Sequence, residues 1–153
     1  MKESAEILLE KADRNLYAAN HDLPSEDPKL IENICYNSQQ AVEKYLKVYI
    51  SYNNIEYPHG HDGHDIGKLL DICKEINSVF NELDKVNPDI LTDYAVNLRY
   101  EEMPSPSMKD AKEAVSIAEE VRSFVLDKVK DISVDKTRDK EFNKNGPELD
   151  IDF

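Results

Sequence analysis

The residues best suited to chemistry in this chain are four long polar side chains, Gln40, Glu43, Lys44 and Lys47, in an otherwise strongly apolar segment. Residues three, four and seven positions apart lie on one side of an α-helix, so this spacing predicts one contiguous patch of donors, acceptors and charge. The patch could be an ordinary solvated helix face, on which the Glu43–Lys47 pair adds roughly a few tenths of a kcal/mol. It could also be a surface specified for binding.

A second chemical candidate is the segment 59–65, which contains three histidines and two aspartates. All five are competent ligands for a divalent metal ion, but their spacing does not match a standard site. Two glycines make the segment flexible, so binding would have to order it. We therefore predict no metal site and no cofactor, and expect Asp65 to cap a helix while His64 packs or hydrogen-bonds against a neighbouring helix end.

The elements that must position these residues are helices. Apolar residues recur at spacings of three and four, Asp27 and Ser107 are suitable N-caps, and the prolines in Met103-Pro104-Ser105-Pro106 break the pattern. The predicted fold class is all-α, a compact up-and-down bundle of about five helices, at about residues 4–20, 27–53, 65–76, 88–98 and 107–130. The second helix is apolar on more than one side, which favours contact with a partner surface.

Composition sets the remaining bounds. The net charge of −13 excludes a protein that holds long nucleic acid by bulk electrostatics, although a local basic patch is compatible with it. Cys35 and Cys73 occupy helical core positions, which predicts buried, reduced thiols. There is no apolar run of about 20 residues, so we expect a cytoplasmic protein with no membrane partner.

The sequence predicts one domain and a tail. Residues 1–132 carry the helical pattern, whereas 133–153 are rich in Asp, Lys, Asn and Glu with few apolar side chains. Such a segment buries too little surface to offset its ordering entropy. We therefore expect an acidic, mobile C-terminal tail.

Four local patterns between about Glu6 and Lys130 resemble the HEPN domain family. They are Ala12-Asp13-x-x-Leu16, the run Cys35–Lys47 with its Gln-Gln-Ala-x-Glu-Lys core, His64-Asp65-Ile66, and Asp93-Tyr94 followed by Arg99-Tyr100. The resemblance implies a HEPN bundle that forms a homodimer and binds a nucleotide or RNA. Members of the branch are often encoded beside a minimal nucleotidyltransferase, which implies a HEPN/nucleotidyltransferase pair of the toxin–antitoxin kind.

The resemblance also implies the positions of a ligand site. In that interpretation Lys44, Lys47 and Arg99 meet phosphate at a dimer cleft, since an arginine fork suits anions. An internal ion pair of Arg99 with Asp93 or Glu43 is the alternative. The full set of candidate ligand-binding residues is Gln40, Glu43, Lys44, Lys47, His64, Asp65, Arg99 and Tyr100. Nearby tyrosines could stack on a base, but tyrosines at helical spacing favour a core or interface. They are Tyr45, Tyr49, Tyr94 and Tyr100.

The enzymatic branch of the family resembles a metal-independent ribonuclease in which an arginine is followed after four to six residues by a histidine. No histidine follows Arg99 in this chain, so no catalytic residue is predicted there. Arg14 and His21 match the spacing formally, but in the first helix. Whether the chain is an enzyme stays open. Besides the binding module, the alternatives are a metal-independent endoribonuclease with a nonstandard site and a non-catalytic helical scaffold.

Overall fold

The computed structural model describes residues 3–94 and 104–140, with side chains up to Lys130. All regular structure in these ranges is helical, so the all-α prediction is confirmed. The α-helices are α1 (Glu3–Asp22), α2 (Ile31–Tyr52), α3 (Ile66–Ile76) and α4 (Met108–Lys140). Short 3₁₀ segments connect them: η1 (Leu23–Ser25), η2 (Pro28–Leu30), η3 (Gly60–His64), η4 (Ser78–Lys85) and η5 (Pro88–Tyr94).

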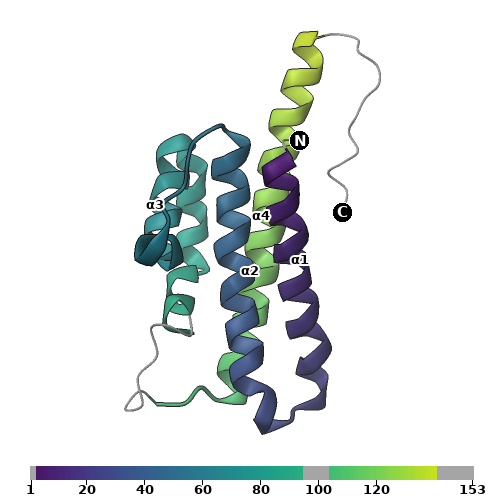
Figure 1. Cartoon of the computed structure of the whole chain (residues 1–153), viewed down its shortest axis with the longest axis vertical. Coiled ribbons are helices and arrows are strands. Elements are labelled where there is room, and N and C mark those ends of the chain that lie inside the picture. Colours follow the sequence, from purple (N-terminus) through teal and green to yellow (C-terminus); the bar gives the residue numbers. More distant parts are fainter. Residues whose placement is uncertain (1–2, 95–103, 141–153) are drawn as a thin grey trace.

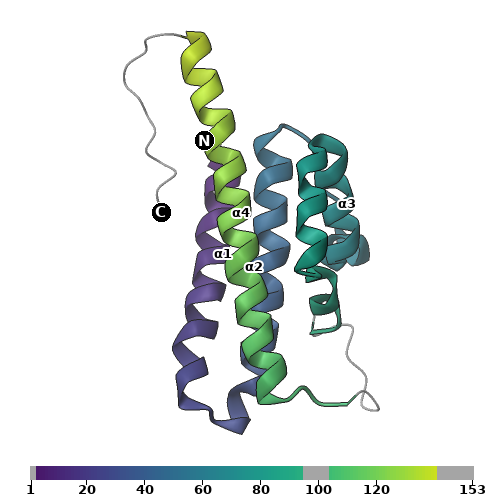
Figure 2. The same ribbon diagram turned by 180° about the vertical axis from the view of Figure 1, so that it is seen from behind.

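Helix α2 is the centre of the bundle. Figure 1 shows it between α1 and α3, and the reverse view in Figure 2 shows α4 running along α1 and α2. It contacts α1, α3, α4 and η5, and its apolar side chains are buried almost all round. The extra apolar surface of this helix was expected to contact a partner. It is instead covered by other elements of the same chain.

The predicted caps are present, although Asp27 caps the 3₁₀ segment η2 and α2 itself begins at Ile31. Asp27 Oδ1 accepts a hydrogen bond of 2.9 Å from Lys29 N, and Asp65 Oδ1 accepts one of 3.2 Å from Lys68 N. Ser107 and Asp110 form a reciprocal capping box, with distances of 3.1 Å from Asp110 N to Ser107 Oγ and 2.9 Å from Ser107 N to Asp110 Oδ2. These side chains satisfy backbone N–H groups that would otherwise lack partners at the helix starts.

Two segments differ from the predicted helices. The 3₁₀ segment η4 was not predicted; Asn77 caps it, and Phe80 and Leu83 bury one side of it. The helix predicted from Pro88 is present as η5 up to Tyr94, and its continuation to residue 98 lies outside the described residues. The backbone of α4 is helical to Lys140. The division into a bundle over 1–132 and a tail over 133–153 stays a prediction.

The core lies on both sides of α2. Tyr49 and Phe80 have ring centroids 4.5 Å apart, and Phe80 meets Phe124 edge to face at 4.9 Å, so α2, η4 and α4 share one aromatic cluster. Cys35 and Cys73 are buried, reduced thiols, as the sequence predicted. Packing in this core fixes the position of α2 along its axis and its rotation about that axis. It therefore determines which way the polar side chains of α2 point.

Candidate functional site

A buried carboxylate lies at the middle of α2. The Glu43 side chain is only 4% exposed, and its Oε2 accepts a hydrogen bond of 2.9 Å from Lys47 Nζ. Its Oε1 accepts from Gln39 Nε2 at 3.0 Å and lies 3.1 Å from His64 Nδ1. Gln40 Nε2 makes a longer contact of 3.4 Å with the same oxygen. We call Gln39, Gln40, Glu43, Lys47 and His64 the Glu43 network.

The burial of Glu43 corrects the interpretation of the patch as an ordinary solvated face. A carboxylate removed from water is costly unless it is paired and hydrogen-bonded. Glu43 meets that condition because both of its oxygens face donors. The network therefore joins α2 to the end of η3 through His64, as expected for a histidine packed against a neighbouring helix.

The Lys47 ammonium is enclosed by the segment before α3. It lies 5.1 Å from the centroid of the Tyr57 ring, a cation–π distance, and its side chain is only 12% exposed. Gly63 packs so closely that an added Cβ would lie 3.6 Å from Lys47 Nζ and 2.6 Å from the Pro58 carbonyl oxygen. Lys47 is thus neutralised by Glu43 and covered by residues 57–63.

Lys44 has a different environment, between α1 and α2. Its Nζ donates to Asn15 Oδ1 and to Gln40 Oε1, both at 2.9 Å. Asn15 Nδ2 in turn donates to Asn37 Oδ1 at 2.9 Å. We call Asn15, Asn37, Gln40 and Lys44 the amide face. Gln40 also belongs to the Glu43 network, so the two groups form one polar surface across α2.

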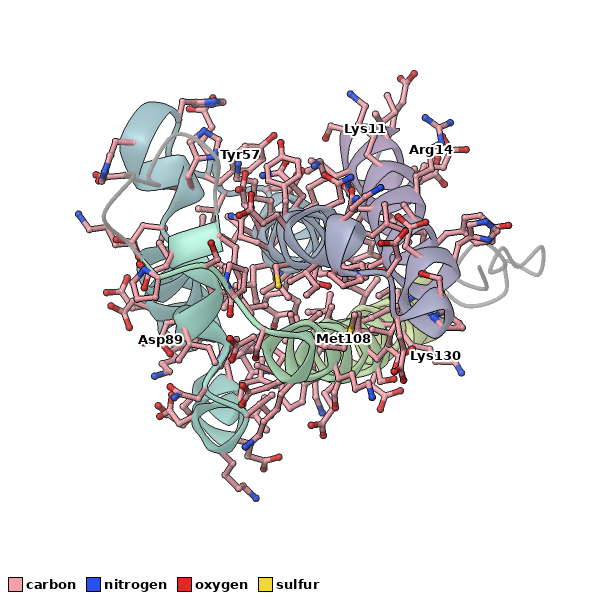
Figure 3. The ribbon with its side chains drawn as sticks, turned by 90° about the horizontal axis from the view of Figure 1, so that it is seen from below. Lys11, Arg14, Tyr57, Asp89, Met108 and Lys130 are labelled. Atoms are coloured by element: carbon pink, nitrogen blue, oxygen red, sulfur yellow. The ribbon has the colours of Figure 1, made fainter. Side chains whose placement is uncertain are left out.

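The electrostatics of Lys44 follow from this arrangement. Burial lowers the pKa of its ammonium most; Glu43 opposes the shift, and the charges of Lys47 and Lys11 add to it. Figure 3 shows Lys11 and Tyr57 on the same side of the molecule, opposite the side where Met108 of α4 lies. The amide face and the Glu43 network therefore occupy the side of α2 that α4 does not cover.

A separate ion pair, Asp13 with Arg122, links α1 to α4, and a hydrogen bond from Tyr45 adds α2 to it. Asp13 Oδ1 accepts a hydrogen bond from the Tyr45 hydroxyl and one of 2.9 Å from Arg122 Nε. Burial, followed by the hydrogen bond to Asp13, raises the pKa of Tyr45. Tyr45 and Tyr49 are buried, so the core interpretation of these tyrosines is confirmed. Asp13 of α1 therefore connects that helix to Tyr45 of α2 and to Arg122 of α4.

The structure brings together five of the predicted site residues: Gln40, Glu43, Lys44, Lys47 and His64. Asp65 caps α3. Arg99 and Tyr100 lie outside the described residues, so their roles stay predictions. Within ranges 3–94 and 104–140, no group of three or more His, Cys, Asp or Glu side chains is placed to hold a metal ion.

Sequence reasoning missed Gln39, Asn15 and Asn37. Gln39 could have been found, because it lies four residues before Glu43 on the same helix and its amide can reach that carboxylate. Asn15 and Asn37 meet only because α1 and α2 pack side by side in one particular register. No local spacing in the sequence predicts that contact.

The sequence model of the HEPN domain family matches residues 5–129 of this chain. This range includes every member of the Glu43 network and of the amide face. The chain belongs to the HEPN domain family. No curated protein and no solved structure matches it significantly. Among the described residues of this HEPN chain, no helix has the length and apolarity needed to cross a membrane.

Proposed function

We propose that this HEPN chain is a homodimeric module that binds a nucleotide or RNA, with Lys44 of the amide face contacting a phosphate. The observation that carries the proposal is the state of the Lys44 ammonium. It is half-buried, it donates to two neutral amide oxygens, and it forms no ion pair with the part of the chain that is described. An ammonium has three donors, so one N–H remains for a ligand.

The neighbouring charges favour an anion at this position. Glu43 lies near Lys44, but its carboxylate is bonded to Lys47 at 2.9 Å and is buried within the network. The largest charge effect on Lys44 is the attraction of Glu43, whereas Lys47, which is itself paired with Glu43, and Lys11 repel the Lys44 charge. A bound phosphate would relieve that repulsion, and the amides of Asn15 and Gln40 offer polar groups beside it. Such a local site is compatible with a chain of net charge −13.

The biological setting that we propose is a HEPN/nucleotidyltransferase pair of the toxin–antitoxin kind. It is supported by membership of the HEPN family together with the Gln-Gln-Ala-x-Glu-Lys run. The proposed module lacks the standard ribonuclease motif, because the sequence from Tyr100 to Pro106 contains no histidine. The nucleotidyltransferase would then act on or with the dimer.

The test is a binding titration with a labelled oligoribonucleotide and, separately, with ATP. Lys44→Met keeps the aliphatic stem but removes the charge, and we expect binding about tenfold weaker or worse, about 1.4 kcal/mol. Lys85→Met removes an exposed lysine on η4 and should bind like wild type. Equal affinity of the Lys44 variant and wild type would contradict the proposal.

A cleavage assay in chelator separates the binding module from a nonstandard ribonuclease. Arg14 and His21 are both exposed on α1, and neither is bonded to the Glu43 network. We expect wild type to leave RNA intact. Cleavage that is lost in Arg99→Ala or in His21→Ala, with the oligomer unchanged, would establish the enzymatic alternative.

A further inference from the structure

One side of α1 is exposed along its whole length and follows the spacing of a helix–helix seam. Its members are separated alternately by four and three residues, the pattern with which helices pack against each other. Figure 1 shows α1 at the edge of the bundle, beside α2. We call these residues the α1 stripe, and every one of them is exposed: Glu3, Ile7, Glu10, Arg14, Tyr17 and His21.

The α1 stripe exposes apolar surface that the described part of the chain does not cover. Ile7 is 46% exposed and Tyr17 is 71% exposed, and they are two of the four large hydrophobic side chains exposed in the described parts of the chain. The Tyr17 ring stacks on His21 with centroids 6.0 Å apart. Arg14 reaches Glu10 only at 3.8 Å with both side chains largely in water, so this pair adds little to stability.

The order of residues in the α1 stripe is self-complementary. If a second copy of α1 packs antiparallel, with the two-fold axis near Ala12, Ile7 lies opposite Tyr17 of the second copy. Glu10 then lies opposite Arg14, and Glu3 opposite His21. Each apolar residue thus meets an apolar residue, and each acid meets a base, twice by symmetry. A parallel pair would instead place like charges opposite each other.

We propose that the α1 stripe is the homodimer interface, formed by antiparallel packing against α1 of a second copy of this chain. The inference rests on the homodimer in the proposed function and does not depend on RNA binding. It identifies the surface and the register. A single pair of helices buries less than the roughly 800 Å² per partner of a standard interface, so the dimer dissociates on dilution.

This arrangement would place the two amide faces on the same side of the dimer, with the two α1 helices between them. A two-fold axis between antiparallel helices keeps the same side of both copies facing the same way. Lys11 lies beside the α1 stripe, next to Ala12, and on the side of the molecule that carries Tyr57. The two Lys11 side chains would flank the axis, and one polyanion could contact both copies.

The test is sedimentation velocity over a range of concentrations, without nucleic acid. Glu10→Arg places arginine opposite Arg14 of the second copy, and Arg14→Glu places two acids opposite each other. Each variant alone should therefore raise the protein concentration at which half of the chains are dimeric at least about tenfold. An equimolar mixture of the two variants should recover a dimer, because each copy then supplies the charge that the other needs. Circular dichroism confirms that each variant remains helical.

Matched controls carry the same charge changes on another helix. Glu120→Arg and Lys109→Glu lie on exposed positions of α4 and should leave the midpoint unchanged. A wild-type chain that stays monomeric throughout would overturn the proposal, as would a mixture that fails to recover the dimer. Loss of the dimer in the α4 controls alone would place the interface elsewhere. Nucleotide and RNA titrations on the same variants are read separately, so failure of binding and failure of this interface are distinguishable.

Discussion

Glu43 and Lys44 are adjacent in the sequence but have opposite electrostatic surroundings. The Glu43 charge is met by the Lys47 ammonium and by amide and imidazole groups, whereas the Lys44 charge is met by neutral amide oxygens. The cause is the turn of about 100° between consecutive helix residues, which directs one side chain toward η3 and the other toward α1. Glu43 therefore stabilises the fold through its partners in the network, whereas the Lys44 ammonium is the group that we propose contacts a ligand.

Replacing Glu43 by alanine should destabilise the chain strongly. The change leaves the Lys47 ammonium in a buried position without its partner and leaves Gln39 and His64 without an acceptor. Breaking a buried ion pair by removing one partner costs about 3–5 kcal/mol, and the 12% exposure of Lys47 places the expected loss at the lower end, about 3 kcal/mol. Urea unfolding followed by circular dichroism measures it.

The matched control is Glu75→Ala, which removes an exposed acid from α3. Substitutions at such surface positions usually change the free energy of unfolding by less than about 0.5 kcal/mol. A similarly small loss in Glu43→Ala would mean that the buried Glu43 network does not exist as described.

Spacing within one helix predicted part of this site. Positions three, four and seven apart correctly indicated that Gln40, Glu43, Lys44 and Lys47 lie close together. Spacing could not predict which of them is buried, because burial depends on residues 57–64 folding back over α2. The contact between Asn15 and Lys44 depends on how α1 and α2 are aligned, which is a long-range property.

At the scale of elements, caps and proline positions were the reliable signals. Asp65 and the Ser107–Asp110 box fix helix starts through hydrogen bonds between near neighbours, so local sequence is enough to predict them. The segment η4 was missed because it is only eight residues long and buries only Phe80 and Leu83, too few apolar positions to indicate a separate helix by spacing. The central place of α2 was also missed, since an all-round apolar helix can be covered by its own chain or by a partner.

The segment over Lys47 depends on a glycine, so Gly63→Ala should destabilise it. The new Cβ would lie 2.6 Å from the Pro58 carbonyl oxygen, a backbone atom that cannot move aside cheaply. Overpacking of this kind costs about 1–3 kcal/mol. We expect a loss of about 2 kcal/mol in urea unfolding, together with faster hydrogen exchange in residues 58–64.

Gly60→Ala is the informative comparison in the same segment. Gly60 has a φ of +69° but no atom within 4 Å of an added Cβ, so its cost is backbone strain of only about 1 kcal/mol. Equal effects of the two substitutions would argue against the close packing of Gly63 on Pro58.

At the scale of the whole molecule, a chain of net charge −13 keeps a small cationic area on one side of α2. The general negative field disfavours non-specific nucleic-acid binding. A ligand must therefore be held at specific groups, and Lys44, Lys11 and the amides of Asn15 and Gln40 are the groups available there. The proposed α1 dimer would double that area, which favours a ligand with more than one phosphate.

The most direct test of the Lys44 claim is an NMR titration of the lysine side chains with and without nucleotide. The free protein should show a Lys44 pKa below the ordinary lysine value, and bound phosphate should raise it by stabilising the charged form. By linkage, nucleotide affinity should fall as pH rises through the Lys44 pKa, and this fall should disappear in Lys44→Arg. Unchanged Lys44 signals, with shifts spread equally over exposed lysines such as Lys85, would contradict the account.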